Sequence, residues 1–148
     1  MKLLLDADVL IGALDRNDQH HEEARALFDG WNERGDTRLI SIVNLSEVLV
    51  APAASPAQLA VAREAIAALG VSAHRPSEAI AIDAARLRGR YPISLPDAYC
   101  LATAKQTGST VISFDHKLLQ AASDHQVELE PMRRGGRRRR QDEGGGSA

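Results

Sequence analysis

Short apolar runs that end at an acidic residue alternate along this chain with longer segments of helical periodicity. Residues 1–5 form an apolar run that ends at Asp6, and residues 110–114 form a β-branched run that ends at Asp115. Apolar runs of this length are typical of strands that are covered on both faces. Because such strands are joined by crossover helices, the alternation predicts an α/β fold with a short, mostly parallel sheet flanked by helices.

Capping residues, glycines and prolines predict where the individual elements begin and end. We expect strands at residues 1–5, 39–41, 71–73, 110–114 and 127–129. We expect helices at residues 9–14, 20–34, 43–50, 56–70, 78–89 and 95–108, and a short one around Leu118 and Leu119. In this interpretation Asp8 caps the first helix, and Ser41, Ser77 and Ser94 cap later ones.

The chain length and the change of composition near Pro131 predict one domain and a tail. With 148 residues, 44% of them hydrophobic, the chain can bury a single core, which we place at residues 1–131. Residues 132–148 have no apolar periodicity and are expected to be a basic, Gly-rich disordered tail. Residues 1–132 hold 12 Lys and Arg against 18 Asp and Glu, a balance of −6, whereas residues 133–148 hold six Arg against two acids, a balance of +4. An acidic body binds a phosphate backbone poorly without cations.

Cysteine usage and hydropathy indicate the compartment. A single cysteine excludes an internal disulfide and a cysteine-rich zinc site, which fits a reducing cytosol. No apolar run approaches the roughly 20 residues that cross a bilayer, and the first ten residues contain acids that a signal peptide lacks. We therefore expect a cytoplasmic protein without a membrane segment. Aromatic residues make up only 3% of the chain, which leaves little material for base-stacking platforms.

Four acidic residues are candidates for one site at the edge of the sheet. Asp6 and Asp115 follow strands, and sites in parallel sheets form at the carboxyl ends of strands. Asp97 lies in the first turn of a predicted helix, where the helix dipole favours the ionised form. Glu47 is the only acid among the apolar residues 42–51, so its helix should present it inward or at the rim of the sheet.

Carboxylates gathered without Lys or Arg partners raise one another's pKa, and a divalent cation removes that cost. Mg²⁺ or Mn²⁺ suits oxygen ligands of this kind. A metal held in this way can activate water for in-line attack on phosphorus. The acidic residues therefore favour metal-dependent phosphodiester hydrolysis.

Three segments, LLLDADVLIGAL, ISIVNLSEVL and LPDAYCLATAKQTGSTVISFDHKL, resemble the successive signatures of PIN domains over about residues 1–130. The segment HEEA at residues 21–24 is similar to the H-x-x-A start of a helix in that family. In size the chain is similar to the VapC-type toxins of bacterial VapBC toxin–antitoxin systems. The family's four acids fall, residue by residue, on Asp6, Glu47, Asp97 and Asp115.

The resemblance implies a PIN-like α/β/α sandwich and an Mg²⁺-dependent endoribonuclease, with these four acids as catalytic residues and metal ligands. It also implies a homodimer and a VapB-like antitoxin, whose segment wraps the domain and can place a basic side chain in the acidic site. Asp8 stands where the family more often has Asn, Ser or Thr, so it is either an additional ligand or a cap. Ser113 occupies a position where a hydroxyl is common, and we place both residues around the metal ligands rather than on the metal.

Other functions stay open beside the toxin. Asp6 and Asp8 form the D-x-D that haloacid dehalogenase-type phosphatases carry after a strand, with the first Asp as nucleophile. A PIN nuclease of RNA processing would have the same acids, and a non-catalytic RNA-binding or partner-binding module would keep the fold.

Each of the four acids, taken singly, is ordinary at the end of a strand or the start of a helix. Two clustered histidines, His20 and His21, are expected to begin an exposed helix rather than bind metal, and Trp31 and Cys100 are expected to be packing residues. The arginines at 137–140 either contact RNA or form a solvated run.

Overall fold

The computed structural model describes residues 1–125 and residue 127. Four strands form one sheet in the order β3-β2-β1-β4, and every pair is parallel. The strands are β1 (Lys2–Leu5), β2 (Thr37–Ser41), β3 (Val71–His74) and β4 (Thr110–Ile112). Because all four run in one direction, their carboxyl ends share one edge of the sheet, which confirms the predicted α/β class.

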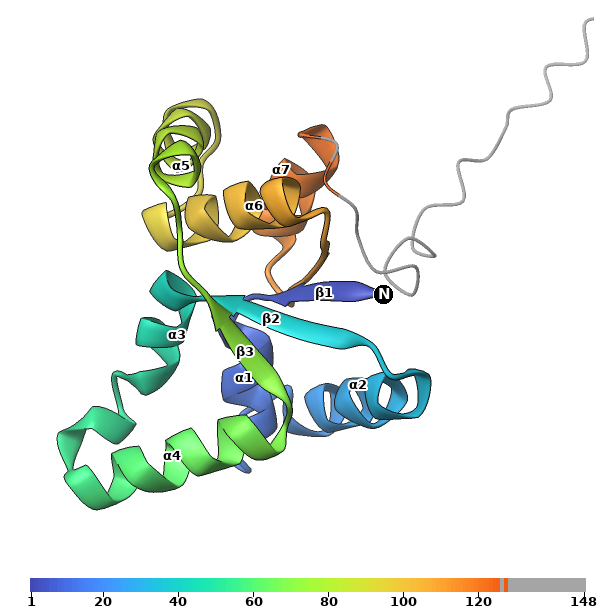
Figure 1. Cartoon of the computed structure of the whole chain (residues 1–148), viewed down its shortest axis with the longest axis vertical. Helices are drawn as coiled ribbons and strands as arrows, with labels where there is room; N and C mark the ends of the chain where they lie inside the picture. Colours follow the sequence, from blue (N-terminus) through green and yellow to red (C-terminus); the bar gives the residue numbers. More distant parts are fainter. Residues whose placement is uncertain (126, 128–148) are drawn as a thin grey trace, which may run out of the picture.

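Helices cover both faces of this sheet and make an α/β/α sandwich (Figure 1). Helices α1, α2 and α4 lie on one face and α5, α6 and α7 on the other, while α3 leads away from the end of β2. Their bounds are α1 (Ala7–Leu14), α2 (His21–Arg34), α3 (Ile42–Leu49), α4 (Pro56–Ala68), α5 (Glu78–Arg90), α6 (Leu95–Thr107) and α7 (His116–Asp124), with a 3₁₀ turn η1 (Pro52–Ala54). None of the helices within residues 1–125 has the length and apolar character needed to cross a bilayer.

The central strand β1 is buried on both sides, as its apolar run predicted. Leu3 and Leu5 pack into the core beneath α1 and α2, whereas Leu4 packs into the second core beneath α5 and α6. This alternation is the period of two that a strand imposes on its side chains. Trp31 and Cys100 are completely buried, one in each core, so both predicted packing roles are confirmed.

The start of α2 packs closely against α1, which gives the H-x-x-A segment a structural explanation. A Cβ on Gly12 would lie 3.3 Å from the Cβ of Ala24, so the two helices approach at residues without bulky side chains. His21 Nδ1 lies 2.7 Å from the carbonyl oxygen of Gly12, within hydrogen-bond distance. His21 and Ala24 therefore join α2 to α1.

Three element predictions were wrong in detail. The cap of α1 is Asp6 and not Asp8, because the Asp6 side chain accepts the amide of Ala7 and the helix begins there. The strand predicted at 110–114 ends at Ile112, because the amide of Phe114 donates to the Asp8 carboxylate instead of a neighbouring strand. The second strand begins at Thr37, two residues before the predicted start.

Of the strand predicted at 127–129, Val127 lies in no helix or strand, and the other two residues lie outside the described part. The tail predicted at 132–148 also lies outside it.

Candidate active site

The edge of the sheet carries a row of five carboxylates, which we call the acidic row: Asp115, Asp8, Asp6, Asp97 and Glu47. Adjacent members interact electrostatically, Asp115 with Asp8, Asp8 with Asp6, Asp6 with Asp97, and Asp97 with Glu47. The four predicted acids are thus brought to one edge, and Asp8 joins them as a fifth. They come from the ends of β1 and β4 and from the beginnings or body of α1, α3 and α6.

Asp6 lies at the centre of the row and is only 5% exposed. Its Oδ1 accepts the amide of Ala7 at 2.8 Å, and its Oδ2 accepts the hydroxyl of Ser113 at 2.8 Å. Burial raises the pKa of Asp6 to about 8, with the charges of Asp8 and Asp97 adding to that rise while the two hydrogen bonds oppose it. In the absence of a cation, this environment favours the protonated form of the carboxyl group.

Asp8 faces the row from the first turn of α1 instead of capping the helix. Its Oδ2 accepts the amide of Phe114 at 3.0 Å, and its Oδ1 is buried without a hydrogen-bond partner. Burial, with the charge of Asp115, raises the pKa of Asp8 to about 6, against the effect of the Phe114 hydrogen bond. A buried carboxylate oxygen without a partner is costly, which makes Asp8 a candidate ligand.

Ser113 links the two strand ends that carry the row. Its hydroxyl donates to Asp6 Oδ2 at 2.8 Å and accepts the amide of Asp115 at 3.0 Å. The carboxylate of Asp115 in turn accepts the amide of Lys117 at 2.9 Å and caps α7. Ser113 thus lies beside the carboxylates, where the sequence placed it.

Asp97 begins α6 in a reciprocal cap with Ser94. The amide of Asp97 donates to Ser94 Oγ at 3.2 Å, and the amide of Ser94 donates to Asp97 Oδ2 at 3.3 Å. The cap at Ser94 was predicted, and the reciprocal hydrogen bond holds the half-buried carboxylate of Asp97 at the helix N-terminus.

Of the two placements expected for Glu47, inward or at the rim of the sheet, the structure shows the second. The residue is exposed on α3, and partial burial of its carboxylate raises its pKa, opposed by a hydrogen bond from Asn44. An exposed carboxylate avoids the free-energy cost of burying an unpaired acid. Glu47 reaches the row at its rim.

Asn44 is the residue that the sequence reasoning missed. It is completely buried, and its Nδ2 lies 3.2 Å from Glu47 Oε2 and 3.1 Å from the carbonyl oxygen of Pro96. It therefore joins α3 to the start of α6, where Asp97 lies. The available signal was its spacing: Ser41, Asn44 and Glu47 recur every three residues along this mostly apolar segment.

The donor chemistry of the row fits a hard divalent cation. No Lys or Arg within residues 1–125 forms an ion pair with any of the five acids. No three His, Cys, Asp or Glu side chains in this part of the chain are already grouped closely enough to hold a metal. Mg²⁺ usually keeps several waters and is bound through one or two carboxylates, so it does not require such a group. The unpartnered Asp8 Oδ1 and the raised pKa of Asp6 fit a site of that kind.

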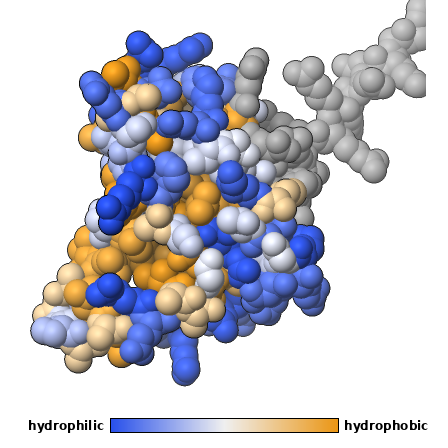
Figure 2. All heavy atoms as spheres, viewed as in Figure 1, coloured by the Kyte–Doolittle hydropathy of each residue, from blue (hydrophilic) through white to orange (hydrophobic). Residues whose placement is uncertain are grey.

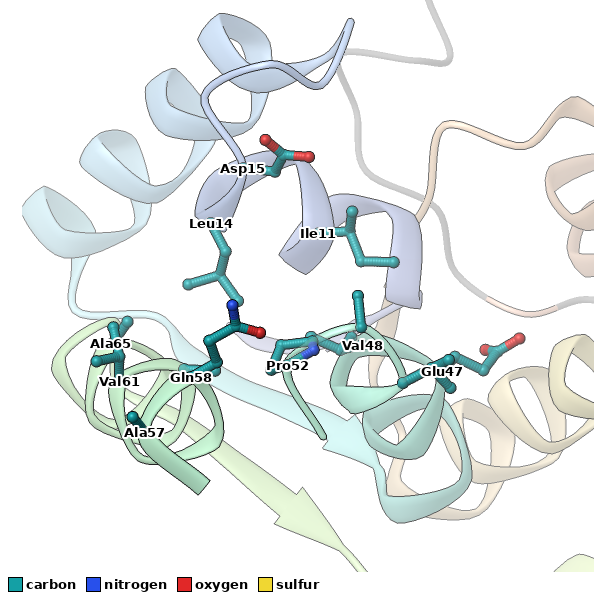
Figure 3. Close-up of a pocket in the computed structure, with 13 residues that line it drawn as sticks. Ile11, Leu14, Asp15, Glu47, Val48, Pro52, Ala57, Gln58, Val61 and Ala65 are labelled. Atoms are coloured by element: carbon teal, nitrogen blue, oxygen red, sulfur yellow. The ribbon is translucent and has the colours of Figure 1, made fainter. Parts of the chain in front are cut away.

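An apolar groove of about 940 Å³ opens beside Glu47. It is lined by α1, α3, η1 and α4, and Figure 2 shows it as an apolar hollow on this face. Val50 and Val61 line it and are 74% and 66% exposed. Figure 3 shows Glu47 at one end of the groove, with its carboxylate directed away from α4. The groove is thus continuous with the rim of the acidic row.

Solved structures with this fold include complexes of bacterial toxins and antitoxins. The chain is similar to a toxin–antitoxin complex from Klebsiella pneumoniae, with 27% identity, a TM-score of 0.62 and coverage of 76% of this chain and 86% of that one. It is similar in fold to FitAcB from Neisseria gonorrhoeae, with 23% identity, a TM-score of 0.62 and coverage of 86% and 95%. It is also similar in fold to the sarcin-ricin loop cleaving toxin VapC20 of Mycobacterium tuberculosis, with 16% identity, a TM-score of 0.66 and coverage of 80% and 94%.

No curated protein sequence matches the chain significantly. The model of the PIN domain family matches residues 3–124, which is most of the chain and includes all five acids of the row. The resemblance inferred from the three sequence segments is therefore confirmed, and the chain belongs to the PIN domain family.

Proposed function

We propose that this protein is a metal-dependent endoribonuclease toxin, which hydrolyses RNA phosphodiester bonds and is neutralised by a VapB-like antitoxin. The observation that carries the proposal is the acidic row, in which five carboxylates interact with one another and pair with no Lys or Arg of the described chain. Only a cation relieves such repulsion while keeping the acids ionised. Family membership and the similar toxin complexes support nuclease chemistry at this edge.

We assign metal binding, directly or through metal-bound waters, to Asp6, Asp97, Asp115 and Glu47, and we add Asp8 because of its buried, unpartnered Oδ1. Mg²⁺ or Mn²⁺ bound there would lower the pKa of water and stabilise charge on the phosphate oxygens. Ser113 orients Asp6 through its hydroxyl, and Asn44 orients Glu47 through its amide. Both act by holding a carboxylate in place.

The proposed reaction excludes the phosphatase reading of the D-x-D segment. The PIN domain family model matches residues 3–124, which contain both Asp6 and Asp8, and the D-x-D interpretation gives no role to Glu47 or Asp97. A nuclease of RNA processing would use the same residues, and its substrate would be RNA in the cytoplasm as well. The similar toxin–antitoxin complexes favour the toxin.

The groove beside Glu47 is where we place the antitoxin. Val50, which follows α3, and Val61 of α4 are exposed and offer an apolar surface that a partner segment can cover, in the manner of a helix bound in a groove. Because the carboxylate of Glu47 is directed away from α4 at one end of the groove, a partner segment that extends past this end could place a basic side chain beside it. Val61→Glu should leave RNA cleavage unchanged and weaken neutralisation by a candidate antitoxin at least tenfold.

A homodimer is the remaining part of the proposal. Three neighbouring helices, α3, α5 and α6, carry the exposed apolar residues Ile42, Ile82 and Leu95, which we assign to the interface. Sedimentation equilibrium should give twice the chain mass for the wild type and the monomer mass for Ile82→Glu combined with Leu95→Glu. A monomeric wild type would contradict the dimer without affecting the nuclease.

The central test is an RNA cleavage assay on the purified full chain, with structured and unpaired RNA, in Mg²⁺, Mn²⁺ or EDTA. Cleavage should require metal and should be lost in Asp6→Asn. Asp36→Asn is a matched control, because Asp36 is equally buried but lies away from the row, beside the chain N-terminus. Turnover of a phosphomonoester with intact RNA would contradict the proposal.

A further inference from the structure

His20 lies at the start of α2, and its ring stacks on the ring of Phe114. The two ring centroids are 4.3 Å apart, and the planes are inclined by 19°. His20 is the N-cap residue of α2, yet its side chain makes no capping hydrogen bond to the helix. Ser, Thr, Asn or Asp is preferred at an N-cap, because a side-chain oxygen can accept a free amide there. The imidazole is therefore used for contact with Phe114 and not for the helix.

Phe114 is held rigidly beside the acidic row. Its amide donates to Asp8 Oδ2 at 3.0 Å, and it lies between Ser113 and Asp115 in the chain. Phe114 is buried, whereas the side chain of His20 that stacks on it is partly exposed. The charged form of His20 also lowers the pKa of Asp8, which places the imidazole within electrostatic reach of the row.

The neighbouring His21 has a different role, which makes the pair informative. His21 is tied to the carbonyl oxygen of Gly12 between α1 and α2. The side chain of His20 is 34% exposed, and its Nδ1 lies 3.7 Å from Glu23 Oε2 at the edge of the ring. An imidazole stacked on one face and exposed at the rim of a site is suited to stack a second flat group.

We propose that His20, supported by Phe114, is a stacking platform for the base of an unpaired nucleotide next to the cleaved phosphate. The proposal rests on the proposed function, since it assumes RNA at the acidic row. Every base has a π-face, and stacking on an aromatic ring or His is a common way to hold single-stranded RNA. Such a base must leave its duplex, so the platform selects loops and single strands over paired RNA.

The test uses an RNA that the wild type cleaves, with 2-aminopurine placed at successive positions. Stacking quenches its fluorescence, and binding is measured with Mg²⁺ present in an Asp97→Asn background that does not cleave. We expect strong quenching at one position near the cleavage site. His20→Leu should remove the quenching there and weaken RNA binding by about tenfold, and His20→Phe should restore both, because the ring is kept and the charge is lost.

Control variants distinguish ring stacking by His20 from an effect on folding and from an effect of the imidazole charge. His21→Leu should lower the melting temperature and leave the position-specific quenching intact. If His20→Phe behaves like His20→Leu, the charge and not the ring matters, and the proposal is overturned. Unchanged RNA binding by His20→Leu, with or without weaker binding of a candidate antitoxin, would also overturn it. If the wild type cleaves no RNA in Mg²⁺ or Mn²⁺, it is the proposed function that fails.

Discussion

Two aspartates near the opposite ends of β1 are equally buried, yet their pKa values move in opposite directions. Asp6 follows the strand and Asp36 lies beside its beginning, and each is 5% exposed. Asp36 accepts the N-terminal amine of Met1 at 2.9 Å and the guanidinium of Arg34 at 3.0 Å, which lower its pKa. In the described part of the chain, the charges that act most strongly on Asp6 are the carboxylates of Asp8 and Asp97, and its pKa is raised to about 8.

The difference shows that the partner, and not the burial, separates a structural acid from a candidate functional one. At Asp36 the two cations compensate the loss of hydration, so the ionised form stabilises the fold. At Asp6 no cation within residues 1–125 supplies the compensating charge. Substitutions of Asp6 should therefore affect catalysis, and substitutions of Asp36 should affect stability.

The largest expected effect is on catalysis. Asp6→Asn should reduce RNA cleavage at least about 100-fold, the loss of roughly 3 kcal/mol of transition-state stabilisation, because a neutral amide is a weaker metal ligand. Cleavage rates measured in Mg²⁺ and Mn²⁺ would check this. Wild-type rates in the folded variant would remove Asp6 from the mechanism.

The matching substitution at the beginning of β1, Asp36→Asn, should reduce stability and not catalysis. Asp36→Asn should lower the free energy of unfolding by about 2 kcal/mol, because the ion pairs with Met1 and Arg34 are lost while both cations remain half-exposed. Chemical denaturation would measure it, and cleavage below the melting temperature should remain near the wild-type rate. A loss of cleavage in the folded variant would contradict the separation of the two acids.

The pH dependence of stability should follow from the raised pKa of Asp6 and the lowered pKa of Asp36, which act in opposite directions. A raised folded-state pKa means that native Asp6 keeps a proton that the unfolded chain releases above pH 4, so the metal-free protein loses stability as pH rises from about 4 to 8. Asp8 contributes in the same direction up to about pH 6. Asp36 has the opposite effect and destabilises the protein only as pH falls below 4.

Melting temperatures without metal should therefore fall by several degrees between pH 5 and 8, and this slope should flatten in Asp6→Asn. Mn²⁺ should raise the melting temperature more at pH 8 than at pH 5.5, because metal binding needs ionised ligands. An increment independent of pH would argue against these carboxylates as the metal ligands.

A smaller effect is expected at Asn44. Asn44→Ala leaves the Pro96 carbonyl and Glu47 without their shared donor, which should lower the free energy of unfolding by about 1 to 2 kcal/mol and slow cleavage about tenfold. Thermal unfolding and kcat would be compared with Ser46→Ala, an exposed position of the same helix. Equal effects of the two substitutions would mean that Asn44 has no positioning role.

The smallest effect is expected at Ser113. Its hydrogen bond lowers the pKa of Asp6, so Ser113→Ala should raise that pKa further and move the acid limb of the pH–rate profile to higher pH. The rate at high pH should fall by less than about tenfold. A profile that moves to lower pH, or a limb that does not move, would show that the Asp6 proton does not control the rate.

Much of the fold was predictable because its signals are local. The Ser94 to Asp97 cap, the stop at Gly35 and the two-sided burial of β1 all follow from residues close together in sequence. The errors arose where a distant partner competed. Asp8 was predicted as a cap because Asp is a good cap, but the amide of Phe114, 106 residues away, takes its carboxylate. Glu47 was expected inward or at the rim and lies at the rim, whereas Asn44, which was not singled out, is the buried polar residue of that helix.

The sequence by itself determined which residues would form strands and helices, and that Asp6 and Asp115 would follow two strands, since hydrophobic periodicity and capping act over a few residues. Only the tertiary structure decided that Asp8 belongs to the acidic row, that Asn44 joins Glu47 to the start of α6, and that His20 rests on Phe114. It also decided the opposite charge environments of Asp6 and Asp36. The reason is physical: pKa and side-chain contacts depend on neighbours within a few ångströms, and packing brings those neighbours from distant parts of the chain.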